Sequence, residues 1–198
     1  MRPLSPVHET VDEGFAALGA AMAPGFGEVT SVSSNRTSIV LWLSWGGRCA
    51  LLGADLEAGP NGWTAVLDGG APDDERASVI KVPHHGSFDA DEPRIWSEFA
   101  SECPVNAVTR YTRLVSPLPR REDVERLAAR PGDLNIAGSL PERLQPAHSA
   151  FDLHLEVASG TGLRWAHGPV GVIRARSSSP EDWRVERFGA VETAPAAL

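Results

Sequence analysis

The stretch SVIKVPHHGS, residues 78–87, decides the fold that the sequence predicts. Its first half is rich in β-branched residues, which is typical of a strand covered on both faces. The proline that follows cannot donate a hydrogen bond to a neighbouring strand, so strand pairing is expected to end there. His84 and His85 then stand beside Gly86, which permits a tight turn. Imidazoles at a strand end can hold a metal ion or transfer a proton.

A second stretch, residues 35–55, predicts a β-hairpin that ends in a carboxylate. An apolar strand leads into Ser44-Trp45-Gly46-Gly47, which is a hairpin turn signal. The return strand ends at Asp55, shortly after a glycine. We therefore expect Asp55, His84 and His85 to meet where neighbouring strands end.

The two stretches together resemble the metallo-β-lactamase fold. The chain is most similar to the hydrolase domain of bacterial DNA-uptake (competence) channel proteins, over residues 32–185. The shared order is N-x-x-S, strand, G-G, strand, L-L-G-x-D and then K-V-P-H-H-G-S. The resemblance implies an α/β (α+β) fold: a metallo-β-lactamase-like half-sandwich with a mixed sheet flanked by helices. It also implies that Asp55 is the bridging carboxylate of a two-metal site, with His84 or His85 near the metals.

The chain departs from this family in its metal ligands. The His-x-His-x-Asp-His motif of the family's first half is absent, because no two of the six histidines are separated by one residue. The residues before position 32 are too few for that half. We therefore expect a helical leader over residues 1–30, a domain over 31–190 that lacks the N-terminal half, and a disordered tail over 191–198.

Three functional interpretations remain open. In the first, a partner chain with the His-x-His-x-Asp-His half completes a split hydrolase, in which Asp55 and His85 are catalytic. In the second, the chain is a non-catalytic binding or assembly module whose histidines form a hydrogen-bonded corner. In the third, Asp55, His84 and His85 bind one zinc ion and a water, although neighbouring residues of an extended strand point in opposite directions. By the resemblance, substrates of an active protein would be phosphodiesters or other esters.

Composition narrows the class of protein. The chain has 198 residues, 42% of them hydrophobic, and a formal net charge of −8, which gives no indication of nucleic-acid binding. No apolar run is long enough to span a bilayer, and no signal peptide pattern is present. Cys49 and Cys103 are interpreted as reduced core residues, which fits a cytoplasmic protein.

Periodicity and turn residues predict the remaining elements. A helix is expected after Thr10, with Phe15, Leu18 and Met22 on one face. Residues 63–67 fit a strand or a helix equally well. Further helices are expected over 91–99 and 119–127, strands over 105–108, 134–136 and 151–157, and a C-terminal antiparallel meander over 163–165, 170–175 and 183–188.

Overall fold

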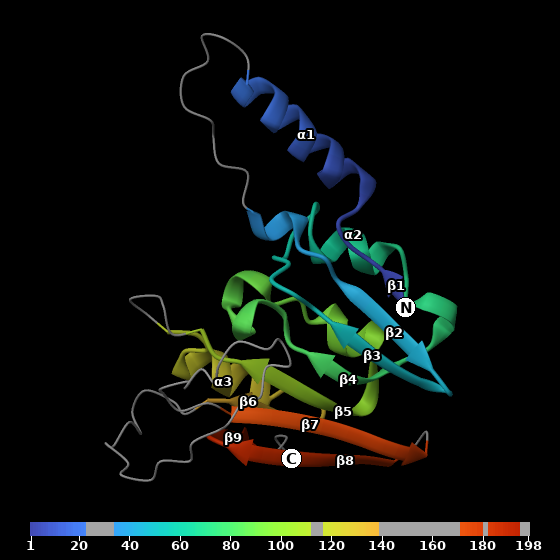
Figure 1. Cartoon of the computed structure of the whole chain (residues 1–198), viewed down its shortest axis with the longest axis vertical. Coiled ribbons are helices and arrows are strands. Elements are labelled where there is room, and N and C mark those ends of the chain that lie inside the picture. The colour runs from blue at the N-terminus through green and yellow to red at the C-terminus, as the bar shows by residue number, and fades with distance from the viewer. Residues whose placement is uncertain (23–33, 112–116, 139–170, 180–181, 195–198) are drawn as a thin grey trace, which may run out of the picture.

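The computed structural model describes residues 1–22, 34–111, 117–138, 171–179 and 182–194. Within these ranges, seven strands form one mixed sheet in the order β1-β2-β3-β4-β5-β6-β9, and β7 and β8 form a separate hairpin (Figure 1). The strands are β1 (Arg2–Pro3), β2 (Leu41–Trp45), β3 (Arg48–Leu52), β4 (Ala77–Lys81), β5 (Ala100–Thr109), β6 (Asp133–Ala137), β7 (Gly171–Ser179), β8 (Asp182–Gly189) and β9 (Val191–Ala194). A mixed sheet with few helices confirms the predicted α+β class.

The hairpin β2–β3 forms where the sequence predicts it. Trp45 pairs with Arg48, so the connection is the two-residue turn Gly46–Gly47. Both glycines have positive φ, +53° and +73°. Such a turn matches the twist of the flanking strands, and glycine adopts this conformation without a steric penalty.

The centre of the sheet is parallel. β3 pairs with β4, β4 with β5 and β5 with β6, all in parallel register. The carboxyl ends of these four strands therefore lie at one edge of the sheet. The helices that connect and precede them are α1 (His8–Met22), α2 (Trp63–Asp68) and α3 (Arg121–Ala128), with a π-helical turn over Ile95–Phe99 and shorter turns over Ser34–Thr37, Pro72–Asp74, Pro83–Gly86 and Phe88–Ala90.

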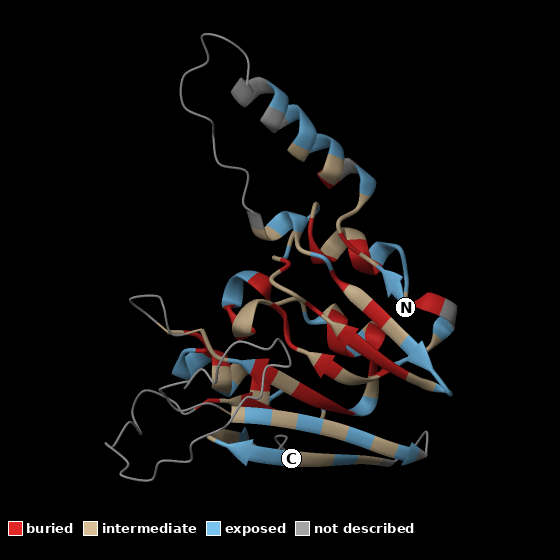
Figure 2. Ribbon diagram, viewed as in Figure 1, coloured by how far each residue is buried: buried red, intermediate tan, exposed pale blue. Residues whose placement is uncertain are grey.

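One face of the sheet carries the hydrophobic core (Figure 2). Register places Trp42, Leu51 and Ile80 side by side on this face, and each is fully buried or nearly so. Apolar side chains of α2, α3 and the π-helical turn cover them, and Phe99 meets Trp42 edge to face with ring centroids 5.8 Å apart. Each fully buried side chain of this size contributes about 1.5–3 kcal/mol to folding.

The opposite face is less covered; it is apolar over β2, β3 and the middle of β4, and polar at Lys81 and Asn135. Leu41, Leu43, Leu52 and Val79 share this face and are only half-buried. The β7–β8 hairpin joins the sheet through polar contacts. Trp183 Nε1 donates to Ser78 Oγ (2.9 Å), and Arg187 Nε donates to Asn135 Oδ1 (2.8 Å).

Several expectations from the sequence need correction. Residues 191–194, expected in a disordered tail, form β9, which pairs with β6 at the sheet edge. Cys103 is exposed, whereas Cys49 is buried as predicted; neither cysteine is in a disulfide bond.

The helix expected after Thr10 is α1, which extends away from the sheet (Figure 1). Residues 63–67, whose sequence fits a strand or a helix equally well, lie in the helix α2. The helix expected over 91–99 is shorter, a π-helical turn over Ile95–Phe99. The strands expected over 151–157 and 163–165 lie outside the described residues.

Candidate functional site

The candidate site lies at the carboxyl edge of the parallel strands. Asp55 follows β3 by three residues, and His84 and His85 follow β4 by three and four. Thr109 is the last residue of β5, the next strand in the sheet. In α/β sheets this edge is the usual place for a ligand.

The histidine turn has an unusual backbone. His84 and His85 have φ of +42° and +54°, and Gly86 continues the left-handed turn at +79°. For non-glycine residues this conformation costs roughly 1–2 kcal/mol each, so surrounding contacts must hold it. In an extended strand, adjacent histidines would point to opposite sides. The turn instead leaves the two rings 6.3 Å apart between centroids and tilted by 59°.

Backbone hydrogen bonds tie this turn to the strand ends. The His84 N–H donates to the Ala54 carbonyl (2.8 Å), and the Ser87 N–H donates to the His84 carbonyl (2.9 Å). The Gly53 N–H donates to the Lys81 carbonyl (3.1 Å). The loop that carries Asp55 is therefore fixed directly against the turn that carries the histidines.

His85 is oriented toward Asp55. Its Nδ1 lies 2.8 Å from the Thr109 carbonyl oxygen, which can only accept, so Nδ1 carries the proton. The other ring nitrogen, Nε2, faces Asp55, whose Oδ1 is 3.7 Å away. Tyr111 stacks on the imidazole with ring centroids 5.1 Å apart. Asp55 remains 46% exposed and His85 19% exposed, so the pair is accessible from solvent.

His84 has different partners. Its Nε2 lies 3.4 Å from the Asn35 amide nitrogen, which also donates to Glu57 Oε1 (3.0 Å). Because an amide N–H can only donate, His84 Nε2 accepts and its proton is on Nδ1. That Nδ1 is buried and has no hydrogen-bond partner among the described residues. The structure thus groups His84 with Asn35 and Glu57, and His85 with Asp55 and Thr109.

Lys81, the last residue of β4, adds a positive charge near Asp55. Its ammonium group donates to the Val82 carbonyl (2.9 Å). Burial lowers the pKa of Lys81, and the negative charge of Asp55 partly opposes this shift. Lys81 and Asp55 are therefore electrostatically coupled.

The donor set partly fits a zinc ion. A carboxylate oxygen and an imidazole Nε2 are ordinary zinc ligands, and a carbonyl that accepts from Nδ1 is the usual outer partner of a ligating histidine. Asp55 offers the carboxylate oxygen, and His85 offers Nε2 while its Nδ1 donates to the Thr109 carbonyl. Among the residues that the structure describes, however, no group of three His, Cys, Asp or Glu side chains is placed to hold a metal. The chain thus brings two of its three predicted ligands together.

Sequence reasoning assigned no role to Asn35, Glu57, Thr109 or Tyr111. Thr109 and Tyr111 follow the strand next to β4, and that position is a signal the sequence does contain. Asn35 reaches His84 from 49 residues away, and Glu57 is linked to His84 only through the Asn35 amide. No local pattern predicts these contacts.

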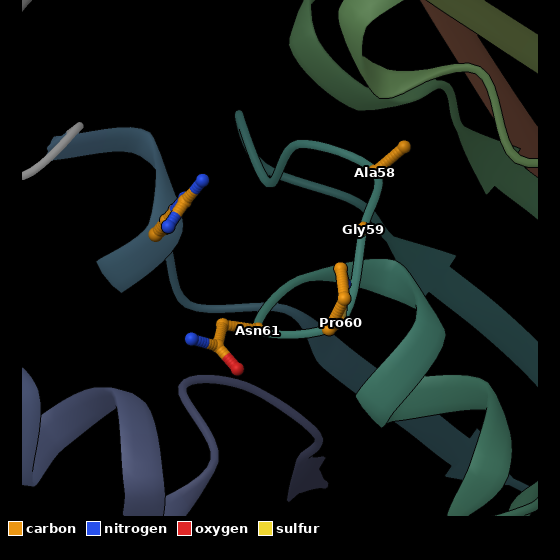
Figure 3. A pocket seen from close by; sticks show the side chains of 5 residues that line it. Ala58, Gly59, Pro60 and Asn61 are labelled. Atoms are coloured by element: carbon orange, nitrogen blue, oxygen red, sulfur yellow. The ribbon is translucent and has the colours of Figure 1, made fainter.

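A shallow cavity of about 240 Å³ lies beside the Asn35–Glu57 pair. It is lined by Arg36, Ala58, Gly59, Pro60 and Asn61. Figure 3 shows the loop of residues 58–61 forming one wall. Two of the lining residues, Arg36 and Ala58, directly follow Asn35 and Glu57 in the chain, but none of the candidate site residues lines the cavity.

Comparisons with protein-family models, curated proteins and solved structures returned no match. The resemblance to metallo-β-lactamases therefore stays a prediction. In the described part of the chain, no helix combines the length and the apolar character needed to cross a membrane.

Proposed function

We propose that this chain supplies one half of a metal-dependent hydrolase site, with Asp55 and His85 as metal ligands and catalytic residues. The observation that carries the proposal is the 3.7 Å approach of Asp55 Oδ1 to His85 Nε2, with His85 Nδ1 bonded to the Thr109 carbonyl. The sequence resemblance supports the same reaction class, hydrolysis of phosphodiesters or other esters. The cytoplasmic location remains the expectation drawn from the reduced cysteines.

A bound zinc ion would act as a Lewis acid toward an ester or phosphoryl oxygen. The residues of this chain have separate tasks. Asp55 would supply an anionic ligand that solvent can reach. His85 supplies a neutral ligand whose orientation is fixed by Thr109 on one side and by Tyr111 on its ring face. Lys81 limits the negative charge that accumulates around Asp55.

The remaining ligands would come from a partner protein chain that carries a His-x-His-x-Asp-His motif. A half-buried apolar patch on the less covered face of the sheet supports this part of the proposal. Leu41, Leu43, Leu52 and Val79 lie together on that face, and covering them would bury further apolar surface. A partner that packs there would reach the carboxyl edge of β3 and β4.

A second candidate is a non-catalytic binding or assembly module. It is favoured by the hydrogen bonds that already satisfy one nitrogen of each histidine, from Asn35 to His84 and from His85 to Thr109. In such a module the left-handed turn is a structural corner, and Asp55 binds no metal.

Zinc titration by calorimetry separates these candidates. We expect the chain alone to bind one zinc ion weakly, and His85→Ala and Asp55→Asn each to abolish the binding. His8→Ala is the matched control, because it removes an exposed histidine that also faces a carboxylate, with His8 Nδ1 2.9 Å from Asp12 Oδ2. Wild-type protein that gives no binding heat at millimolar zinc, or heat lost equally in the His8 variant, would contradict the proposal and favour the binding module.

The same samples test whether the site is incomplete. With zinc present, we expect the chain alone to hydrolyse bis(p-nitrophenyl) phosphate no faster than zinc in buffer. Turnover that depends on Asp55 and His85 in the isolated chain would favour the self-sufficient mononuclear hydrolase instead.

A further inference from the structure

Arg126 of helix α3 is hydrogen-bonded to the histidine turn. Arg126 Nη2 donates to the Gly86 carbonyl oxygen (2.8 Å), across 40 residues of sequence. Gly86 is the residue directly after His85 and the last left-handed residue of the turn. The position of this carbonyl sets the direction in which the chain leaves the histidines.

The guanidinium of Arg126 is itself held from two further sides. Nη2 also donates to Asp123 Oδ1 (2.7 Å), and Nη1 lies 2.7 Å from Asp91 Oδ1. Asp123 is 4% exposed and Asp91 11% exposed, so these charge pairs are largely shielded from water. The planar guanidinium matches this arrangement, because its donors diverge in a fixed fork.

The turn needs such an anchor. Two consecutive non-glycine residues in the left-handed region persist only where the surroundings hold them. The bond from His84 N–H to Ala54 fixes the start of the turn, and the bond from Arg126 to Gly86 fixes its end. His85 lies between these two anchors, so a change at either one would alter the direction of its ring.

We propose that Arg126 is a positioning residue: it holds the left-handed turn so that His85 Nε2 stays directed at Asp55. Its effect on metal affinity rests on the function proposed above, whereas its effect on the turn does not. Arg126 acts through Gly86 and touches neither Asp55 nor the imidazole.

The test compares Arg126→Met with Arg130→Met. Arg130 is one helical turn further along, also pairs with Asp91 (3.0 Å), and lies over the ring of Trp96. It has no hydrogen bond to the turn among the described residues. Methionine retains the apolar stem in both variants, so losses of packing are matched.

Two measurements decide the outcome. Hydrogen exchange of the His84 and Ser87 amides measures how firmly the turn is held, and calorimetry measures the affinity for zinc. We expect Arg126→Met to speed exchange of these two amides at least tenfold relative to Arg130→Met, and to weaken zinc binding about tenfold, as loss of an outer partner does. Arg126→Lys, which can still donate to Gly86, should restore part of both effects.

Equal exchange in the two methionine variants would overturn the proposal, because Arg126 would then act only on global stability. If wild-type protein binds no zinc, the proposed function fails, and the amide exchange still decides whether Arg126 positions the turn. If the Arg126→Met variant does not fold, Arg126→Gln and Arg130→Gln, which keep a polar side chain but lose the guanidinium, replace the methionine pair with the same readouts.

Discussion

Gly86 shows how one residue supports the candidate site. Its φ of +79° suits glycine, and a Cβ there would meet Leu127 Cδ1 of the core at 2.7 Å. Gly70 has nearly the same φ, +74°, but a Cβ there would have no heavy atom within 4 Å. The two positions therefore separate the cost of a left-handed backbone from the cost of overpacking.

Alanine substitutions at these positions are expected to differ in size. Gly70→Ala should lower the free energy of unfolding by about 1–2 kcal/mol, the cost of left-handed backbone in an L-residue. Gly86→Ala should lower it by a further ~1–3 kcal/mol, because Leu127 must move within a packed core. Urea unfolding measures both. Equal losses of unfolding free energy in the two variants would mean that α3 does not approach the histidine turn as closely as the structure shows.

A second prediction at this scale concerns Cys49. Its thiol is buried and donates to Glu75 Oε2 (2.7 Å), and burial, followed by this bond, raises the pKa of Cys49 from 9.0 to about 11. Between these pH values the folded chain keeps a proton that the unfolded chain has released, so the free energy of unfolding must fall as pH rises.

Urea unfolding between about pH 8 and 11 checks this prediction. The measurement uses Cys103→Ala as the background, so that only one thiol is present. In this background, Cys49→Ala should make the free energy of unfolding decline less steeply with pH, whatever the substitution does to stability at neutral pH. An unchanged pH dependence would show that Cys49 is not protected as the structure indicates.

At the scale of elements, the sequence predicted those parts that local patterns determine. The β2–β3 hairpin followed from the Trp-Gly-Gly turn signal, and β4 from the β-branched run before Pro83. Periodicity alone could not assign residues 63–67, because five residues are too few to distinguish a buried strand from a helix. That segment is helical in the structure, where Trp63, Val66 and Leu67 are buried in the core.

The candidate site was predictable only in part. Parallel strands bring their carboxyl ends to one edge, so the meeting of Asp55 with His85 followed from strand order. The separation of His84 from that pair did not, because it depends on left-handed φ values that only tertiary contacts maintain. Arg126 and Asn35 lie 40 and 49 residues from their partners, and no local pattern encodes those distances.

At the scale of the whole molecule, β9 is the element that sequence reasoning missed. Val191–Ala194 has a single strongly apolar residue, and its strand character comes from pairing with β6. The Gly138 N–H also donates to the Ala190 carbonyl (2.7 Å), which brings the chain to the sheet edge. β6 contains the buried residues Leu134 and Ile136, so without β9 a central core strand would become an edge strand.

Two truncations test the contribution of β9 to the whole sheet. A chain of residues 1–190 lacks β9, whereas a chain of residues 1–194 retains every paired residue and serves as the control. We expect the shorter chain to lose about 2–4 kcal/mol of unfolding free energy, since several ladder hydrogen bonds at about 0.5–1.5 kcal/mol each are removed. The exposed edge of β6 should also promote association between molecules. Thermal unfolding with light scattering measures both effects, and identical behaviour of the two truncations would show that β9 adds nothing to the sheet.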